Sequence, residues 1–139
     1  ALSYYFSDEY SNHYNKLSRS FVEMVEKGQK ITKEKYFRAL KHQIKAQEVM
    51  DTFFNEYDIV ISMSTSGEAP SLLSPNEKDD AALIWTYVHT PSITTPISKG
   101  PNNLPVSVQF VAKRYNDYKL LRFIEMLEKN DFIPKVKVI

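Results

Sequence analysis

The sequence predicts an α/β fold, with helices in its first half and strands that alternate with helices in its second half. Two observations support this class. Apolar residues recur at helical spacing between residues 10 and 57, whereas residues 58–63 and 104–112 are short apolar segments rich in β-branched side chains. Helices followed by interleaved strands and helices are typical of α/β proteins.

The composition is that of a globular protein of one ordinary domain. Among 139 residues, 18 Lys and Arg face 17 Asp and Glu, so the formal net charge is only +1. This balance gives no electrostatic reason to expect a nucleic acid or an anionic membrane as partner. The sequence has no cysteine, which excludes disulfides and thiolate metal sites and allows a reducing compartment. We therefore expect a cytoplasmic protein.

The chain begins at Ala1, without an initiator methionine and without the charged and apolar regions of a signal peptide. We interpret Ala1 as a processing or expression boundary and expect the natural chain to extend upstream. No apolar run approaches the ~20 residues that cross a bilayer.

Two helices are expected in the first half. The first covers residues 10–27 and is stopped by Gly28, and the second is capped by Thr32 and runs to about Glu56. The second helix carries apolar side chains on two opposed faces, whereas a helix on one core would keep a single stripe. We therefore expect it to pack against two neighbours, one of which can lie outside this sequence. The faces are Phe37, Leu40 and Ile44 on one side, and Ala46, Val49, Met50, Phe53, Phe54 and Tyr57 on the other.

The second half is expected to begin with a strand at residues 58–63 that is covered on both sides, because the run is continuously apolar. Asn116 or Asp117 is expected to cap the last helix. The other expected elements are a polar loop at 64–79, a short helix at 81–89, extended chain at 92–96, a turn at 99–103, an alternating strand at 104–112 and an extended end at 132–139.

No catalytic residue is assigned from the motifs. A serine-rich cluster precedes Gly67, but a nucleophile elbow needs Gly-x-Ser-x-Gly and only one of its glycines is present. The three glycines lie too far apart for a phosphate-binding loop. His13, His42 and His89 have no metal-ligand spacing, so neither a metal nor a cofactor is expected.

Three residues are candidates for substrate binding: Asp79, Trp85 and His89. Asp79 lies next to Asp80, and this pair is either a substrate-binding acid or a helix cap favoured by the helix dipole. Trp85 either lines a pocket or fills the core. His89 precedes Pro91 in a segment expected near the core, where a structural histidine with satisfied hydrogen bonds is favoured over a base.

Four segments, in order, resemble the amidase signature family. Residues 58–70 resemble its strand and Pro-Thr-x-x-x-x-Ala-Pro loop, and residues 85–96 resemble its Trp-Thr-x-x-Gly-x-Pro-x-x-x-x-Pro segment. Residues 104–112 are similar to its Leu-Pro-Val-Gly-x-Gln strand, and residues 117–121 match the Asp-x-x-Leu-Leu that opens its last helix. The resemblance covers about residues 17–130 and implies the C-terminal part of the amidase signature fold, a mixed β-sheet flanked by helices. It makes residues 1–139 one C-terminal segment, helical at 10–57 and with strands and helices at 58–139.

The sequence departs from the family pattern at several places. Met63 stands where the family has Pro, and His89 and Ser107 stand where it has Gly. His89 would narrow the space that a glycine leaves open. The family uses a Ser, cis-Ser, Lys triad whose nucleophile lies in a Gly/Ser-rich stretch, and this sequence has no such cluster of glycines. The resemblance thus places the triad upstream, so this chain alone is not expected to be catalytic.

The resemblance implies a C-terminal fragment of an amide hydrolase that works through an acyl-enzyme and contributes strands and part of the substrate pocket. Its implied partners are the N-terminal half of the same amidase and a small amide substrate. Asp79 lies twelve residues before Pro91, where glutamine-using tRNA amidotransferase A subunits carry a substrate-binding acid. Residues 23–26 lack the basic residues of those subunits, which favours a general amidase.

Two alternatives remain open. One is a non-catalytic amidase-like binding module, which predicts a surface without a large orphan apolar patch. The other is part of a glutaminyl- or asparaginyl-tRNA amidotransferase A subunit, although the near-neutral charge argues against RNA contact. A severed amidase half instead predicts exposed apolar surface where the N-terminal half would dock, and hence either self-association into a homo-oligomer or marginal stability.

Overall fold

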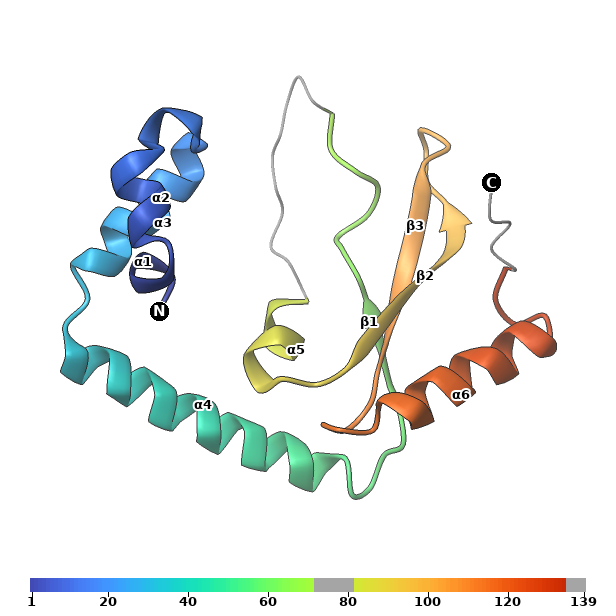
Figure 1. The fold of residues 1–139 in the computed structure, drawn as a ribbon. Helices are drawn as coiled ribbons and strands as arrows, with labels where there is room; N and C mark the ends of the chain where they lie inside the picture. The colour runs from blue at the N-terminus through green and yellow to red at the C-terminus, as the bar shows by residue number, and fades with distance from the viewer. Residues whose placement is uncertain (72–81, 135–139) are drawn as a thin grey trace. The chain divides into compact units, whose positions relative to one another are not determined.

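The computed structural model describes residues 1–71 and 82–134 and has the expected α/β character (Figure 1). The chain divides into two compact units, Ala1–His42 and Gln43–Ile139. The elements in chain order are α1 (Leu2–Tyr5), α2 (Ser7–Asn12), the 3₁₀ turn η1 (Tyr14–Lys16), α3 (Arg19–Gln29), α4 (Lys33–Phe53), β1 (Val60–Met63), α5 (Leu83–Val88), β2 (Ser92–Lys99), β3 (Pro105–Val111) and α6 (Asp117–Lys129).

The single helix predicted for residues 10–27 is wrong, because α2 ends at Asn12 and α3 begins only at Arg19. Ser18 has an extended backbone, and its hydroxyl accepts a hydrogen bond from the Phe21 N–H at 3.3 Å. Serine competes with the helical backbone in this way and therefore starts a new helix instead of continuing the old one. Val22 and Val25 of α3 are buried.

Gly28 does not stop α3, which continues to Gln29. A Cβ atom at Gly28 would lie 2.9 Å from Ser3 Oγ and 3.0 Å from Ser3 Cβ. Such distances are too short for a real Cβ contact. The glycine therefore serves the close approach of α1 to α3.

Helix α4 begins as expected, since the Lys35 N–H donates to Thr32 Oγ1 at 3.3 Å. It ends at Phe53, three residues before the predicted end. One of the two predicted apolar faces, the face with Ala46, Met50 and Phe54, is partly buried. Phe54 belongs to a core cluster, and Ala46 and Met50 pack against that cluster. On the opposite face Phe37 and Ile44 are 58% and 54% exposed.

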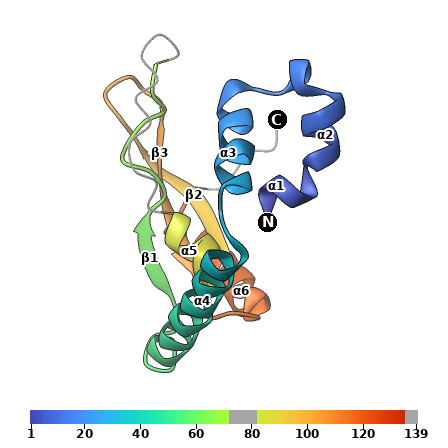
Figure 2. The ribbon, with the colours of Figure 1, turned by 90° about the vertical axis from the view of Figure 1, so that its left-hand side faces the viewer.

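The described sheet has three antiparallel strands in the order β1-β3-β2 (Figure 2). The extended chain at 92–96 and the strand at 104–112 are thus confirmed as β2 and β3, joined by a turn in which Asn103 has φ 63°. We expected a mixed sheet, which contains parallel as well as antiparallel pairs. The described strands pair only antiparallel. The predicted short helix is α5.

The prediction that β1 is covered on both sides is wrong. Val60 and Ser62 are half-buried, but Ile61 and Met63 are 60% and 47% exposed. Among the described strands β1 lies at the edge of the sheet, so its alternate side chains lack the cover that a central strand receives. A continuous apolar run does not by itself distinguish these two situations.

Strand β3 separates two core clusters, because successive side chains point to opposite faces of a sheet. Val111 packs with Phe54, Trp85 and Val88 on the side of α5. The neighbouring Phe110 packs with Ala112, Leu120 and Ile133 on the side of α6. Figure 1 shows α5 and α6 on opposite sides of the strands.

The capping position of α6 is Asn116, as predicted, although its side chain makes no capping hydrogen bond. The predicted extended end lies largely in residues 135–139, outside the described residues. In residues 1–71 and 82–134, no helix combines the length and the apolar character needed to cross a membrane.

Candidate functional site

Trp85 connects the core to the polar part of the sheet. α5 places its ring in the cluster with Phe54, Val88 and Val111. Its indole Nε1–H donates to Ser62 Oγ on β1 at 3.3 Å. A buried indole needs such an acceptor, so the structure accounts for Trp85 as a core residue with a satisfied N–H. Its predicted role in substrate binding stays a prediction.

A row of polar side chains runs across the same face of the sheet. Ser62 on β1 is paired with Gln109 on β3, which is paired with Thr94 on β2. Gln109 is only 6% exposed, and its Nε2 donates to Ser92 Oγ at 3.3 Å. Gln109 Oε1 is buried and has no hydrogen-bond partner within the described part of the chain.

The free acceptor at Gln109 requires an explanation, because leaving a buried polar group unsatisfied costs about 1–3 kcal/mol. Chemically, this oxygen can accept one N–H from outside the described residues. Gln109 was not among the site residues predicted from the sequence. Its only signal was its place in the Leu-Pro-Val-Gly-x-Gln resemblance.

His89 ends α5 in the left-handed conformation, with φ 60° and ψ 37°. Its side chain is exposed, which corrects the expectation that it lies near the core. The reason is the left-handed turn itself, which ends the helix after Val88, so that His89 does not share the buried position of that residue. Glycine reaches this conformation without strain, which explains why the family pattern has Gly at this position.

Gln43 of α4 contacts both His89 and the end of α5. Its Nε2 donates to the Tyr87 carbonyl oxygen at 2.8 Å and lies 3.2 Å from His89 Nε2. Because Gln43 Nε2 can only donate, this contact is a hydrogen bond in the tautomer of His89 that accepts at Nε2 and carries its proton on Nδ1. His89 Nδ1–H is therefore the donor that this site offers.

Asp79, the third predicted substrate-binding residue, lies outside the described residues, and so does its neighbour Asp80. The structure therefore brings Trp85 and His89 together on one short helix and its cap. The roles proposed for all three residues stay predictions.

The serine cluster before Gly67 has a structural role in the described residues. Ser64 is buried, and both its backbone N–H and its hydroxyl donate to the Ser107 carbonyl oxygen, at 3.3 and 2.9 Å. Thr65 Oγ1 donates to the Gly67 carbonyl oxygen at 2.8 Å. These bonds agree with the interpretation of a polar loop that leaves a strand.

Glu68 was not singled out by the sequence analysis, yet it makes a dense set of contacts. Its carboxylate accepts hydrogen bonds from the Asn102 N–H at 2.9 and 3.1 Å, from Asn102 Nδ2 at 2.8 Å and from the Leu104 N–H at 3.0 Å. Desolvation opposes its ionisation, but these hydrogen bonds outweigh desolvation and lower the pKa of Glu68 below its ordinary value. Glu68 is therefore charged at neutral pH.

An ion pair joins α4 to the segment after β3. Arg114 donates to both carboxylate oxygens of Asp51, and its Nη1 donates to Gln47 Oε1 at 2.9 Å. The hydrogen bonds from Arg114 exceed the opposing effect of desolvation, so the pKa of Asp51 is lowered. This network fixes α4 to the segment after β3, and neither Trp85 nor His89 takes part in it.

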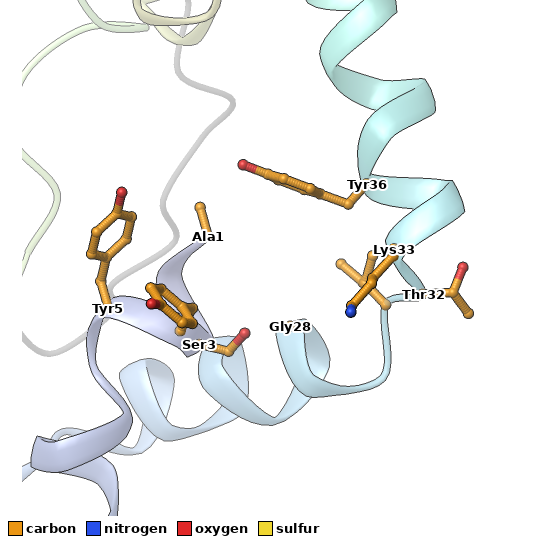
Figure 3. Close-up of a pocket in the computed structure, with 9 residues that line it drawn as sticks. Ala1, Ser3, Tyr5, Gly28, Thr32, Lys33 and Tyr36 are labelled. Atoms are coloured by element: carbon orange, nitrogen blue, oxygen red, sulfur yellow. The ribbon is translucent and has the colours of Figure 1, made fainter.

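A separate hollow of about 380 Å³ lies in the first unit, between α1, the end of α3 and the start of α4 (Figure 3). Figure 3 shows Tyr36 reaching from α4 over this hollow and Ser3 lying against Gly28. Neither Trp85 nor His89 lines it. Within residues 1–71 and 82–134, no group of His, Asp or Glu side chains could hold a metal ion.

The described fold is that of an α/β protein, and comparisons with known proteins identify its family. A family model described as Amidase matches residues 4–121. The chain belongs to the amidase family. The resemblance seen in four short segments is thereby confirmed.

Curated relatives are A subunits of glutamyl-tRNA(Gln) amidotransferases. The subunit of Brachyspira hyodysenteriae (strain ATCC 49526 / WA1) is 26% identical over 100 residues, which are 63% of this chain and 20% of the relative. The A subunit of Thermotoga maritima (strain ATCC 43589 / DSM 3109 / JCM 10099 / NBRC 100826 / MSB8) is 28% identical over 104 residues. These residues are 70% of this chain and 22% of the relative. This chain thus spans about a fifth of the length of these relatives.

Solved structures show the same fold. A chain of a vestigial protein complex, described with the evolutionary origins of an s-triazine catabolic enzyme, aligns with a TM-score of 0.79 at 18% identity, over 97% of this chain and 32% of that one. A crystal structure of an amidase aligns with a TM-score of 0.77 at 16% identity, over 92% and 32%. The Thermotoga maritima A subunit aligns with a TM-score of 0.54 at 26% identity, over 68% and 22%.

Proposed function

We propose that residues 1–139 are the C-terminal segment of an amide hydrolase with a Ser, cis-Ser, Lys triad, and that they supply sheet strands and part of the substrate pocket. The observation that carries this proposal is the family match over residues 4–121. The triad residues come from the N-terminal half of the same amidase, which is the expected protein partner. The expected location is the cytoplasm.

The chemistry assigned to the whole enzyme is hydrolysis of a carboxamide. A serine oxygen attacks the amide carbonyl, the C–N bond breaks with release of ammonia, and water then hydrolyses the acyl-enzyme to a carboxylic acid. In this scheme the present chain binds and orients the substrate and carries no reacting atom. The proposed reaction requires no metal or cofactor.

The proposed pocket wall consists of α5, its cap and the polar sheet face. Trp85 gives it an apolar ring that the Ser62 hydroxyl holds in place, at 3.3 Å from the indole nitrogen. His89 offers an exposed Nδ1–H, and Asp79 would supply a substrate-binding acid as the resemblance implies. Gln109 Oε1 offers a buried acceptor that a donor from the rest of the enzyme can satisfy.

The second candidate function is that this chain forms part of a tRNA amidotransferase A subunit. The 26–28% identity to glutamyl-tRNA(Gln) amidotransferase A subunits favours it. In that case ammonia from glutamine would be transferred instead of released. The net charge of +1 argues against RNA contact through this chain. A non-catalytic binding module is the third candidate.

The test is ammonia release from a panel of small amides that includes glutamine. The 139-residue chain is assayed alone and after mixing with the N-terminal part of its amidase. We expect no turnover by the chain alone and turnover by the mixture. A mixture that binds amides without turnover would favour the binding module, and turnover of glutamine alone would favour the amidotransferase.

A further inference from the structure

We infer that Glu68 is a positioning residue that fixes the loop after β1, residues 64–71, on the turn between β2 and β3. The inference rests on the proposed function, because this loop follows the strand whose Ser62 holds Trp85 in the proposed pocket wall. Family resemblance does not supply it, since Glu68 occupies one of the unspecified positions of the Pro-Thr-x-x-x-x-Ala-Pro pattern.

The turn forms a concave group of N–H donors that matches a carboxylate. Two backbone N–H groups, of Asn102 and Leu104, and the Asn102 side-chain amide converge on the two oxygens of Glu68 at 2.8–3.1 Å. Backbone N–H groups that converge on one point favour an anionic acceptor, because each carries a partial positive charge. Hydrogen bonds to an ionised acceptor are also stronger than neutral ones.

Gly100 is part of the same arrangement. A Cβ atom at this position would lie 2.3 Å from Glu68 Cγ, 2.4 Å from Cδ and 2.5 Å from Oε1. No side chain can share this space with the Glu68 carboxylate. The turn therefore requires a glycine at position 100 if Glu68 is to reach its donors.

The loop is held at two points by these contacts. Ser64 binds the Ser107 carbonyl oxygen through its N–H and its hydroxyl, at 3.3 and 2.9 Å. Glu68 binds the turn four residues later. Gly67 between them has φ 141°, a conformation that side-chain-bearing residues rarely adopt. The Glu68 contact thus adds a second attachment of this loop to the sheet, on the turn between β2 and β3.

The test compares Glu68→Gln, which keeps the size but removes the charge, with Gly100→Ala, which keeps Glu68 but fills its space. Amide hydrogen exchange is measured by NMR in the 139-residue chain. We expect both variants to accelerate exchange at Asn102 and Leu104 about tenfold, and the double variant to add little further. The Asn103 N–H, which donates to the Gly100 carbonyl oxygen at 3.0 Å, is an internal reference in Glu68→Gln.

The positioning role is tested in the active mixture of the chain and the N-terminal part. Glu68→Gln is expected to raise KM several-fold and to leave kcat within about twofold, because loop placement affects substrate binding and no reacting group is lost. Glu125→Gln on α6, which removes a surface carboxylate bound to Lys129, is the control and should change neither constant.

Two results would overturn the inference. If exchange at Asn102 and Leu104 is unchanged in both variants, Glu68 does not hold the turn. If exchange accelerates but KM stays constant in an active mixture, Glu68 holds the loop without positioning substrate. A wild-type mixture without activity would instead contradict the proposed function, and hydrogen exchange alone would then decide whether Glu68 fixes the loop.

Discussion

His89 has a backbone conformation that is unfavourable for any residue with a Cβ atom. Its φ of 60° and ψ of 37° lie in the left-handed region, which costs a non-glycine residue roughly 1–2 kcal/mol. The conformation ends α5 and turns the chain toward β2. The 3.2 Å contact with Gln43 offsets only part of this cost, since the side chain is exposed.

Two substitutions at position 89 separate the backbone from the side chain. His89→Ala removes the imidazole and keeps the Cβ atom, whereas His89→Gly also removes the Cβ atom. We expect the glycine variant to exceed the alanine variant in free energy of unfolding by about 1 kcal/mol. Urea denaturation followed by circular dichroism measures this difference. Equal stability of the two variants would mean that the left-handed conformation is not maintained.

Two buried glutamines form a matched pair for the question of unsatisfied groups. Gln47 Oε1 accepts from Arg114 at 2.9 Å, whereas Gln109 Oε1 has no partner in the described residues. Gln109→Met removes this unsatisfied oxygen together with the hydrogen bond from Nε2 to Ser92 Oγ, and Ser92 is exposed, so its hydroxyl can bind water instead. We therefore expect Gln109→Met to change the free energy of unfolding by less than about 1 kcal/mol, in either direction.

The comparison variant is Gln47→Met, which removes an existing hydrogen bond and should lower the thermal midpoint clearly more. Differential scanning calorimetry of both proteins provides the measurement. If Gln109→Met were the more destabilising of the two, Gln109 Oε1 would have a hydrogen-bond partner in the isolated chain.

Helix α6 contributes one buried stripe to the second unit, and adjacent leucines on it have opposite environments. Leu120 is 1% exposed, whereas Leu121 is 55% exposed. Leu120→Ala should lower the free energy of unfolding by about 2–5 kcal/mol, because it leaves a cavity against Phe110 and Ala112. Leu121→Ala should change it by less than about 0.5 kcal/mol. Chemical denaturation of both variants distinguishes them, and similar losses would contradict this orientation of α6.

Carboxylates that connect elements make stability depend on acid pH. The pKa values of Asp51 and Glu68 are lowered from ordinary values of 3.8 and 4.5. A carboxyl whose folded pKa is depressed stabilises the fold above its unfolded pKa and loses this effect as pH falls through the folded value. Unfolding measured from pH 7 to pH 2.5 should therefore show falling stability below about pH 4.5.

The variant Glu68→Gln tests the origin of that pH dependence. Its stability should fall less steeply between pH 4.5 and pH 3 than that of the wild type, because one depressed carboxyl has been removed. An unchanged slope would show that the Glu68 carboxylate is not held by the turn. Asp51 faces Arg114 and Lys113, so its own contribution should remain in this variant.

Local patterns predicted the elements better than the contacts between them. The alternating side chains of residues 104–112 and the Thr32 cap were enough to place β3 and the start of α4. The break at Ser18 was not predicted, because a serine hydroxyl competes with helical hydrogen bonds only in a particular backbone geometry. The exposure of Ile61 depends on strand order, which a single strand does not encode.

The candidate site was predictable only in part. Trp85 and His89 were singled out from the sequence, and the structure places them in α5 and at its C-cap. Glu68 and Gln109 were missed as site residues because their significance comes from partners far along the chain, such as Asn102, 34 residues after Glu68. Such pairings depend on the register of the sheet and are not visible in sequence spacing.

The molecule as a whole combines a packed core with several exposed apolar side chains on α4 and β1. Phe37, Ile44 and Ile61 are all more than half exposed. Single exposed apolar side chains are ordinary, whereas a contiguous apolar patch marks a surface that another protein segment covers. The proposal that the N-terminal half of an amidase is the partner therefore predicts that such side chains become buried when the two parts are mixed.

The most direct test of the central claim, that this chain supplies a pocket wall and no reacting group, is the measurement of kcat and KM for variants of the active mixture. Trp85→Phe should raise KM several-fold, whereas Ser66→Ala and Lys113→Ala should leave kcat within about twofold. Ser66 and Lys113 are the comparison because a nucleophile and a base within this chain would be of these residue types. A loss of kcat by about a thousandfold or more in Ser66→Ala or Lys113→Ala would contradict the account and place catalysis in this chain.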